Sequence, residues 1–450
     1  MNTFVEQKKK IRLSMARRFS SFRIIVFGFA LLILAGTLLL MTPLASAKGE
    51  WTDFLSALFT STSAVCVTGL VVLDTGTYWS LFGQAVLLIL IQIGGLGIVT
   101  IALAISIAAG KKIGLMQRSV MSDSVSSPQV GGIVKLTKFI LKGVFAIEGL
   151  GALIMAPTFI HDFGVAKGIW FAVFHSVSAF CNAGFDLMGN FSSLTRYASN
   201  PIINITVMVL IVTGGLGFIT WADIVKNKWH FKRYRLQSKI ILTVSLFLIA
   251  VPACVFYFHD FTHETGMTRV FVSLFQSVTT RTAGFNTVDV SKMSEACLFL
   301  MVVLMLIGGS PGSTAGGMKT TTFAIVIGNM LSIMRRKNAT EFGNRRVAEE
   351  TIRSASTIFV MYLSFLTVGV LVIMISDDLP LLPVLYEVAS ACGTVGITMG
   401  ITTGLSAVAR CVIIFLMYLG RIGGLTFIFA ARAKLKVYQA KMPEERVMVG

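Results

Sequence analysis

Apolar residues cluster in stretches long enough to cross a membrane as helices. The hydrocarbon core of a bilayer is about 30 Å thick, and about 20 residues of α-helix span it at 1.5 Å per residue. Eight stretches have this character, and one of them carries Glu148 in its middle. They are Ile24–Ala45, Leu81–Ala108, Phe139–Ile160, Ile202–Ile224, Ile240–Phe258, Leu298–Ile333, Thr357–Ile375 and Val408–Ala430. The pattern predicts an integral membrane protein with eight spans.

Between the two members of each pair of spans lies an apolar segment that is too short to cross. About a dozen residues make roughly 18 Å of helix, which is typical of re-entrant or interfacial helices. Each short segment runs into a loop that ends in glycine. The short segments are Trp51–Ala64, Trp170–Phe180, Val270–Thr280 and Leu381–Ala391, and the loops end at Gly69, Gly184, Gly284 and Gly396.

One unit of helix, short helix, glycine-ended loop and helix therefore occurs four times, with loop glycines about 100 to 115 positions apart. An internal repeat of this kind indicates the architecture of the fold more strongly than any single motif. We expect an all-α integral membrane fold with four pseudo-symmetric repeats, eight transmembrane helices and four short pore helices around one central pore. The expected segments are a basic N-terminus (1–23), repeats at 24–110, 111–224, 225–334 and 335–432, and a C-terminal tail (433–450).

The loops suggest a path for cations. Backbone that is not helical persists at membrane depth only where protein buries it or water lines it, and four loops on one axis meet that demand together. Glycine tolerates positive φ, so successive carbonyls can point into a narrow lumen and replace the hydration shell of potassium. Each short helix would direct its partially negative C-terminal end at the axis. A single glycine loop is as easily a packing or turn element, but four at one period favour a pore. The glycine clusters in the second spans, such as Gly94–Gly97, favour close helix packing.

Composition and charge agree with a membrane protein. Hydrophobic residues make up 55% of the chain, charged residues only 13%, and mean hydropathy is +0.80. The net charge of +18 lies mainly in Lys8–Arg23, Lys111–Lys138, Lys226–Lys239, Arg335–Arg353 and Arg432–Arg446. These segments share one side when the spans are crossed in pairs, which is the positive-inside pattern and predicts cytoplasmic N- and C-termini. The charge therefore indicates topology and attraction to membrane lipid, not nucleic acid binding.

No catalytic constellation is present. The five histidines are dispersed, and no phosphate-binding GxxxxGK[ST] loop occurs, so we expect no enzyme and no cofactor bound by this chain. The six cysteines have neither paired nor metal-ligand spacing. We expect buried free thiols and neither a zinc site nor a disulfide framework.

One segment carries a resemblance to a known family. The run from Gly308 to Lys319 (GGSPGSTAGGMK), taken with the four loops and the IGGLG-type second spans, resembles the Trk/Ktr/HKT superfamily of potassium transporters. The bacterial Ktr membrane (ion-translocating) subunits of the KtrB/KtrD type are the most similar group. The resemblance covers about residues 20–450. It implies channel-like potassium uptake across the bacterial plasma membrane, with Na⁺ as an activating or coupling ion in the alternative.

The resemblance also implies partners and a selectivity filter. The partners are a second copy of the chain and a cytoplasmic ring of RCK-type regulatory subunits that bind ATP or ADP. The loops after Lys111 and Lys226 and the tail are the expected docking segments. Serine at the first filter glycine is associated with sodium transport, so glycine in all four repeats points to potassium. The implied K⁺ ligands are carbonyls of Val67, Thr68, Gly69, Asn182, Ala183, Gly184, Thr282, Ala283, Gly284, Thr394, Val395 and Gly396.

The implied gate lies under the filter. Its glycines and proline cannot hold a continuous helix, although a simple helix break would leave the same pattern. The implied gate residues are Gly308, Gly309, Ser310, Gly312, Ser313, Thr314, Gly316, Gly317 and Arg421. Arg421 lies within a span, where a charge is costly, and would be a barrier to cations. The alternative for Arg421 is a salt bridge to Glu148 or another carboxylate, and Lys319 is expected to reach the cytoplasmic interface.

Two further expectations concern charge and function class. Arg281 lies three residues before Gly284, where its charge would repel a cation, so we expect it to point away and pair with Glu387. The main alternative function is a Na-coupled or Na/K-permeable secondary transporter. A secondary carrier with inverted repeats is disfavoured because all repeats here begin on the same side. A voltage-gated channel is disfavoured because no helix carries arginine at every third position.

Overall fold

Four long helices form the outer frame of the molecule. The computed structural model describes residues 21–109, 114, 117, 118, 120, 121, 132–424, 426, 445 and 448. The long helices are α2 (Ser21–Met41), α7 (Ile133–Phe163), α11 (Leu236–His259) and α15 (Glu349–Asp377), and each is long and apolar enough to cross a membrane. Each exposes large apolar side chains, among them Leu31, Leu153, Leu246 and Leu371, as a lipid-facing surface does.

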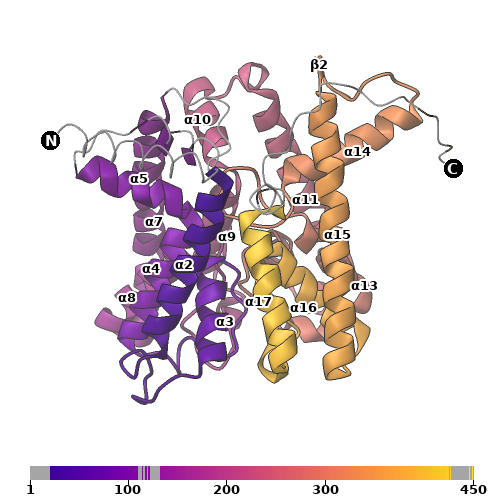
Figure 1. Cartoon of the computed structure of the whole chain (residues 1–450). Coiled ribbons are helices and arrows are strands. Elements are labelled where there is room, and N and C mark those ends of the chain that lie inside the picture. The colour runs from indigo at the N-terminus through magenta and orange to yellow at the C-terminus, as the bar shows by residue number, and fades with distance from the viewer. Residues whose placement is uncertain are drawn as a thin grey trace.

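Four short helices lie inside this frame. They are α3 (Phe54–Val65), α8 (Val165–Phe180), α12 (Gly266–Thr279) and α16 (Leu381–Gly393), close to the predicted positions. Their C-terminal halves are almost wholly buried, and α3 begins where the Asp53 carboxylate accepts a hydrogen bond from the Ser56 amide. Figure 1 shows α3, α8 and α16 in the half of the molecule opposite the hairpin of β1 (Glu341–Phe342) and β2 (Arg345–Arg346). The all-α membrane fold with pore helices is confirmed.

The second helices of the first two repeats are bent sharply, which the continuous apolar pattern did not predict. The chain bends by 95° between α4 (Leu81–Leu96) and α5 (Ile98–Ala108), and by 98° between α9 (Pro201–Gly215) and α10 (Phe218–Asn227). Each of the predicted spans Leu81–Ala108 and Ile202–Ile224 therefore consists of two helices that meet at a bend. The cause is a glycine in a conformation that side-chain-bearing residues avoid: φ and ψ are 84° and 135° at Gly97 and 86° and 136° at Gly217.

The other two repeats end their second helices differently. In the third, α13 (Glu295–Leu306) and α14 (Thr320–Met334) are separated by the segment Gly308–Gly317, hereafter the glycine-rich loop. In the fourth, α17 (Ala407–Ile422) ends at Gly423, which has φ 84° and ψ 131°, nearly those of Gly97. The end of the predicted span Val408–Ala430 lies outside the described residues.

Other glycines of the clusters allow close packing, as predicted. A Cβ on Gly94 would collide with the carbonyl of Val65, and a Cβ on Gly420 with that of Cys392. Both carbonyls lie at the C-terminal ends of pore helices. The clusters therefore combine two roles, because the first glycines admit the pore helix and the last one breaks the span.

The repeats close into a ring through one recurring contact. The second helix of each repeat packs on the pore helix of the next: α4 on α8, α9 on α12, α13 on α16, and α17 on α3. The remaining elements are connections: η1 (Thr195–Tyr197), η2 (Phe231–Arg233), η3 (Phe261–His263), η4 (Val290–Lys292), η5 (Thr402–Gly404) and the two-residue antiparallel strands β1 (Glu341–Phe342) and β2 (Arg345–Arg346). The last contact in this cycle joins repeat four to repeat one, so the repeats enclose a common axis.

Two other expectations concern the cysteines and the basic segments. Cys254 and Cys411 are exposed, so the prediction of buried thiols is wrong for these two and right for the other four. Residues 1–20, most of the loop after Lys111 and almost all of the tail, which include three of the expected basic or docking segments, lie outside the described residues.

Replacing Gly97 with alanine should lower stability, because the φ and ψ of this glycine are strained for any residue with a Cβ, at a cost of about 1–3 kcal/mol. The midpoint of thermal unfolding of the purified protein in detergent measures the effect. Gly149→Ala is the matched control: Gly149 is exposed within α7, and an added Cβ there meets no atom within 4 Å. Equal midpoints for the two variants would contradict the proposed role of Gly97.

Candidate functional site

The four loop glycines meet in one ring, hereafter the filter ring (Gly69, Gly184, Gly284 and Gly396). Each faces the carbonyl that precedes the glycine of the next repeat, so an added Cβ would collide with it. The added Cβ would lie 2.6 Å from Ala183 O at Gly69, 2.8 Å from Ala283 O at Gly184 and 2.6 Å from Val395 O at Gly284, and would collide with Thr68 O at Gly396. The sequence of contacts is cyclic and closes on itself.

The backbone of each loop has the same unusual conformation. Positive φ recurs two residues before each glycine, at Val67, Asn182, Thr282 and Thr394 with values of 50° to 61°, and again at the glycines with values of 68° to 94°. Left-handed conformations at non-glycine residues cost about 1–3 kcal/mol each and persist only where the surroundings impose them. The loops are therefore held in one geometry by their neighbours.

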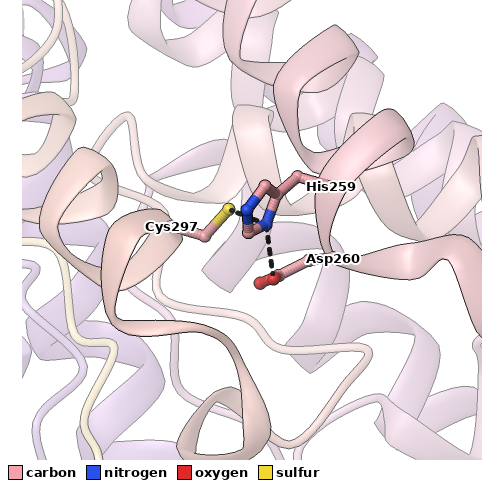
Figure 2. Close-up of side chains that lie close together, drawn as sticks. All are labelled: His259, Asp260 and Cys297. Atoms are coloured by element: carbon pink, nitrogen blue, oxygen red, sulfur yellow. Dashed lines mark hydrogen bonds and ion pairs between the residues drawn. The ribbon is translucent and has the colours of Figure 1, made fainter.

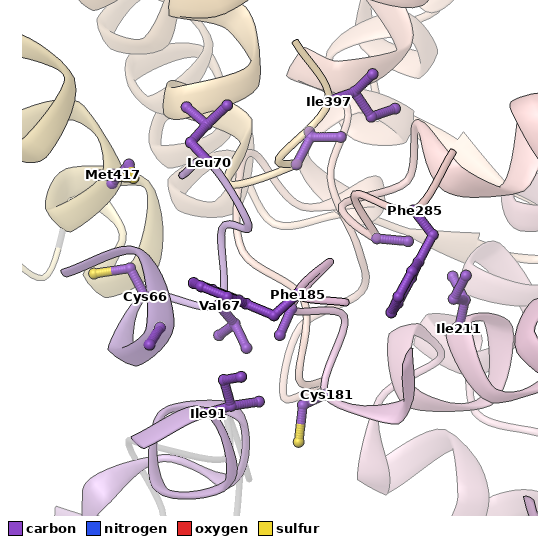
Figure 3. Packing of buried hydrophobic residues seen from close by; sticks show 14 of the residues in the cluster. Cys66, Val67, Leu70, Ile91, Cys181, Phe185, Ile211, Phe285, Ile397 and Met417 are labelled. Atoms are coloured by element: carbon purple, nitrogen blue, oxygen red, sulfur yellow. The ribbon is translucent and has the colours of Figure 1, made fainter. Parts of the chain in front are cut away.

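Apolar packing supplies part of this restraint. Figure 3 shows residues of all four loops in one buried cluster, packed beside side chains of the second helices. The loop residues are Val67, Leu70, Phe185, Phe285 and Ile397, and the helix residues are Ile91 of α4, Ile211 of α9 and Met417 of α17.

Hydroxyl groups of the pore helices supply the rest. Ser63 and Ser390 accept hydrogen bonds of 3.0 Å from the amides of Gly69 and Gly396. In repeats two and three, Ser178 and Thr279 instead donate to the carbonyls of Phe185 and Phe285, at 2.7 and 2.6 Å. Ser63, Ser178 and Ser390 each lie six residues before the loop glycine of their repeat, whereas Thr279 lies five residues before Gly284.

The ring opens into an acidic mouth. A cavity of about 520 Å³ is lined by the four ring glycines together with Asp186, Asn286, Asp289 and Thr398. Burial, opposed by a hydrogen bond from the Met188 amide and reinforced by the charge of Asp74, raises the pKa of Asp186 to about 7. Hydrogen bonds from Ser291 lower the pKa of Asp289, which lies on the exposed rim.

The expected pair between Arg281 and Glu387 is wrong. Glu387 is fully buried and accepts hydrogen bonds from the hydroxyls of Thr398 (2.6 Å) and Thr402 (2.5 Å). Arg281 points behind the ring and donates to Ser245 of α11 at 3.0 Å. The threonines lie 11 and 15 positions after Glu387, so the fourth loop folds back over its own pore helix, which no spacing rule predicted.

The glycine-rich loop lies directly under the ring and binds the broken ends of the second helices. The amides of Ser310 and Thr314 donate to the carbonyls of Gly215 (3.0 Å) and Gly214 (3.2 Å) at the end of α9. The Gly317 amide donates to the Gly420 carbonyl of α17 at 3.2 Å.

Side chains add to the contact between this loop and the ring. The Thr314 hydroxyl lies 3.0 Å from Asn182 Oδ1 and 3.1 Å from the Phe180 carbonyl, which it reaches from below. An added Cβ on Gly316 would collide with the Thr394 hydroxyl. The loop therefore touches residues of the second and fourth pore loops.

Two cations lie at this loop and bind carbonyls. Arg421 donates to the carbonyls of Thr314, Gly94 and Gly95, and makes no ion pair within the described part of the chain. The Glu148 carboxylate instead accepts from Gln92 at 3.2 Å, so the alternative of a Glu148–Arg421 salt bridge is wrong. Lys319 donates to Ala315 and Gly316 at 2.8 and 3.2 Å, so the prediction that it reaches the interface is wrong.

Both cations line a second cavity, of about 320 Å³, on the far side of the loop from the ring. Four pore loops around one axis, with a cavity at each end and an interrupted helix between them, define a multi-pass membrane protein built around a central path.

The chain belongs to the TrkH family of cation transport proteins, whose family profile matches residues 3–440. It is 41% identical to the potassium/sodium uptake protein NtpJ of Enterococcus hirae, over 98% of this chain and 99% of the relative. It is 37% identical to Ktr system potassium uptake protein B of Bacillus subtilis, over 96% of this chain and 97% of the relative. The crystal structure of the potassium transporter TrkH from Vibrio parahaemolyticus shares the fold, with a TM-score of 0.73 at 20% identity, covering 92% and 85% of the two chains.

Cation flux should depend on pH through Asp186. Its pKa of about 7 means that it gains a proton, and the mouth loses a negative charge, as pH falls from 8 to 6. We expect cation uptake into proteoliposomes at low ionic strength to fall about twofold over this interval, because a charged mouth concentrates cations. Asp186→Asn should show the low flux at both pH values.

Asp289→Asn is the control for this experiment. The lowered pKa of Asp289 keeps that carboxylate charged throughout the interval, so its loss should reduce flux equally at pH 6 and pH 8. A pH dependence that survives in Asp186→Asn would contradict the assignment.

Proposed function

We propose that this chain conducts potassium ions through the filter ring, as the ion-translocating subunit of a Ktr-like uptake system in a bacterial plasma membrane with both termini in the cytoplasm. The observation that carries the proposal is the closed ring in which each glycine leaves room for a carbonyl of the next repeat. Backbone carbonyls at such a constriction are the groups that replace the hydration shell of potassium. The names of the relatives, potassium or potassium/sodium uptake proteins, support the same ion.

The proposed ligands are the carbonyls of the three residues that end each pore loop, namely Val67–Gly69, Asn182–Gly184, Thr282–Gly284 and Thr394–Gly396. The amides of Thr68, Ala183, Ala283 and Val395 donate to carbonyls in the last turns of the pore helices, at 2.8 to 3.0 Å. A backbone whose amides are bound on the outside has its carbonyls available for the axis.

The proposed gate consists of the glycine-rich loop and Arg421. The loop obstructs the path beneath the ring, and the guanidinium adds a positive charge that repels cations. The backbone amides of the loop donate to carbonyls of two other repeats, those of Gly214 and Gly215 in the second and of Gly420 in the fourth, and withdrawal of the loop exchanges these hydrogen bonds for water.

The proposed partners are a second copy of the chain and a cytoplasmic ring of RCK-type regulatory subunits that bind ATP or ADP. The relative named as a component of the Ktr system supports association with further subunits. Exposed basic residues beyond α14, among them Arg335, Arg345 and Arg346, offer a docking surface on the same side as the proposed gate.

A sodium-coupled or sodium-permeable transporter is the second candidate. It is favoured by one observation, the 41% identity to a relative named as a potassium/sodium uptake protein. Whether the chain selects potassium or also admits sodium depends on how well the carbonyls of the filter ring replace the hydration shell of potassium.

Gly69→Ser tests the filter directly. An added side chain at Gly69 would collide with the Ala183 carbonyl, so we expect loss of selective potassium uptake and a larger relative uptake of sodium. The measurement is growth rescue of a potassium-uptake-deficient bacterium at low potassium, with ⁸⁶Rb⁺ and ²²Na⁺ uptake in the same strain.

Gly400→Ser is the matched control. Gly400 has the same positive φ of 94° as Gly396, but an added Cβ there meets no atom within 4 Å, so growth should be retained. Failure of the wild type to rescue growth when it is expressed with a Ktr regulatory subunit would refute potassium transport. A Gly69→Ser protein with unchanged ion preference would refute the role of the ring.

Arg421→Gln tests the gate. The variant loses a positive charge and the bonds to Gly94, Gly95 and Thr314, so flux through the chain reconstituted alone should rise several-fold. Arg421→Lys keeps the positive charge but loses the planar set of guanidinium donors. Its flux should lie between those of the wild type and Arg421→Gln.

Arg410→Gln, on the same helix but bonded to Thr403 near the mouth, controls for loss of charge from α17. Unchanged or reduced flux in folded Arg421→Gln protein would count against a gating role.

A further inference from the structure

A separate cluster of donor side chains lies outside the pore, where α11 ends and α13 begins. It consists of His259, the last residue of α11, the adjacent Asp260, and Cys297 in the first turn of α13. Figure 2 shows the imidazole between the thiol and the carboxylate. None of the three belongs to the filter ring or the glycine-rich loop, so the proposed function does not account for them.

The distances fit a tetrahedral metal ion. Nδ1 of His259 lies 3.3 Å from Oδ1 of Asp260 and 3.9 Å from Sγ of Cys297, and all three donor atoms lie within 4.8 Å of one another. Around Zn²⁺, with bonds of about 2.3 Å to sulfur and about 2.0–2.2 Å to nitrogen and oxygen, tetrahedral donors stand roughly 3.3–3.6 Å apart. Side-chain shifts of about 1 Å therefore suffice to coordinate the ion.

Neighbouring groups already orient the donors. Both carboxylate oxygens of Asp260 accept from the Ser294 amide, at 3.3 and 3.2 Å. The Ser294 hydroxyl accepts from the Cys297 amide at 3.4 Å and lies 3.4 Å from His259 Nδ1. Such outer contacts fix ligand direction in metal sites.

Solvent can reach the site from one side. The His259 side chain is 58% exposed, whereas that of Asp260 is only 7% exposed. An ion can therefore enter past the imidazole, and a water molecule can take the fourth position.

The donor set selects the class of ion. Thiolate and imidazole prefer borderline-soft transition metals, whereas Mg²⁺ and Ca²⁺ require oxygen ligands. One imidazole, one thiolate and one carboxylate with an open position is a donor set that Zn²⁺ accepts. His259 and Cys297 are 38 positions apart in the sequence, which explains why cysteine spacing predicted no zinc site.

We propose that His259, Asp260 and Cys297 bind one Zn²⁺ with water as the fourth ligand. The site lies at the same end of the pore as the acidic mouth, since the mouth-lining residues Asp289–Ser291 lead directly into Ser294. A bound ion ties the end of α11 to the start of α13. It thereby restrains the helix whose other end, at Leu306, leads into the glycine-rich loop.

Zinc binding to the purified full-length protein tests this proposal. The protein is prepared in detergent without a polyhistidine tag, and Zn²⁺ affinity is measured by competition with a chromophoric chelator. We expect one ion per chain. Cys297→Ser and His259→Gln should each weaken affinity at least about 100-fold, since loss of an outer-sphere partner alone costs 10–100-fold. Zn²⁺ should also raise the unfolding midpoint of the wild type and not that of the variants.

Two matched controls lie beside the site. Cys254→Ser removes an exposed thiol of the same helix, and His263→Gln removes an exposed imidazole of η3, and both should leave affinity unchanged. Co²⁺ provides a spectroscopic check, because a thiolate-to-cobalt charge-transfer band must appear in the wild type and vanish in Cys297→Ser. Equal Zn²⁺ affinity in wild type and Cys297→Ser, or the absence of that band, would overturn the proposal whether or not the chain conducts potassium.

Discussion

The structure depends on one constraint: at membrane depth, the amides and carbonyls of non-helical backbone must find hydrogen-bond partners within the protein. Each pore loop meets it in two directions. Its amides bond outward to the pore helix, and its glycine packs against a carbonyl of the next repeat. Because the contacts run in a cycle, each loop packs against the loop of the next repeat as well as against its own pore helix. This explains how positive φ values at Val67, Asn182, Thr282 and Thr394 are tolerated in all repeats at once.

The same constraint links the breaks in the second helices to the loop beneath the ring. A helix that ends leaves its last carbonyls without intrahelical partners. Gly214 and Gly215 at the end of α9 accept from the amides of Thr314 and Ser310, and Gly420 in α17 accepts from that of Gly317. The carbonyls at the ends of α9 and α17 thus hold the glycine-rich loop of the third repeat in place. The third repeat can depart from the pseudo-symmetry because its neighbours supply hydrogen-bond acceptors for the glycine-rich loop.

Much of this arrangement is visible in the sequence, and the remainder is hidden for physical reasons. Periodic apolar segments and loop glycines predict the pore helices and the ring residues, because burial and positive φ leave strong marks. The bends at Gly97 and Gly217 do not appear, since apolar residues continue through them and hydropathy is indifferent to direction. The predictions of side-chain pairs were the least successful. Glu387 accepts hydrogen bonds from Thr398 and Thr402, and Arg281 donates to Ser245, because hydroxyls compete with ions for buried charges and are too common in the sequence to single out.

The position of Arg421 shows why a buried charge here need not be matched by a carboxylate. Its guanidinium binds Gly94 and Gly95, whose carbonyls lie at the C-terminal end of α4, where the helix dipole is negative. That dipole and the loop carbonyl of Thr314 stabilise the cation without a counter-charge. A salt bridge to Glu148 would have to be broken at the cost of exposing two buried charges, often several kcal/mol. Carbonyl partners are uncharged, so they hold the guanidinium without adding a second buried charge.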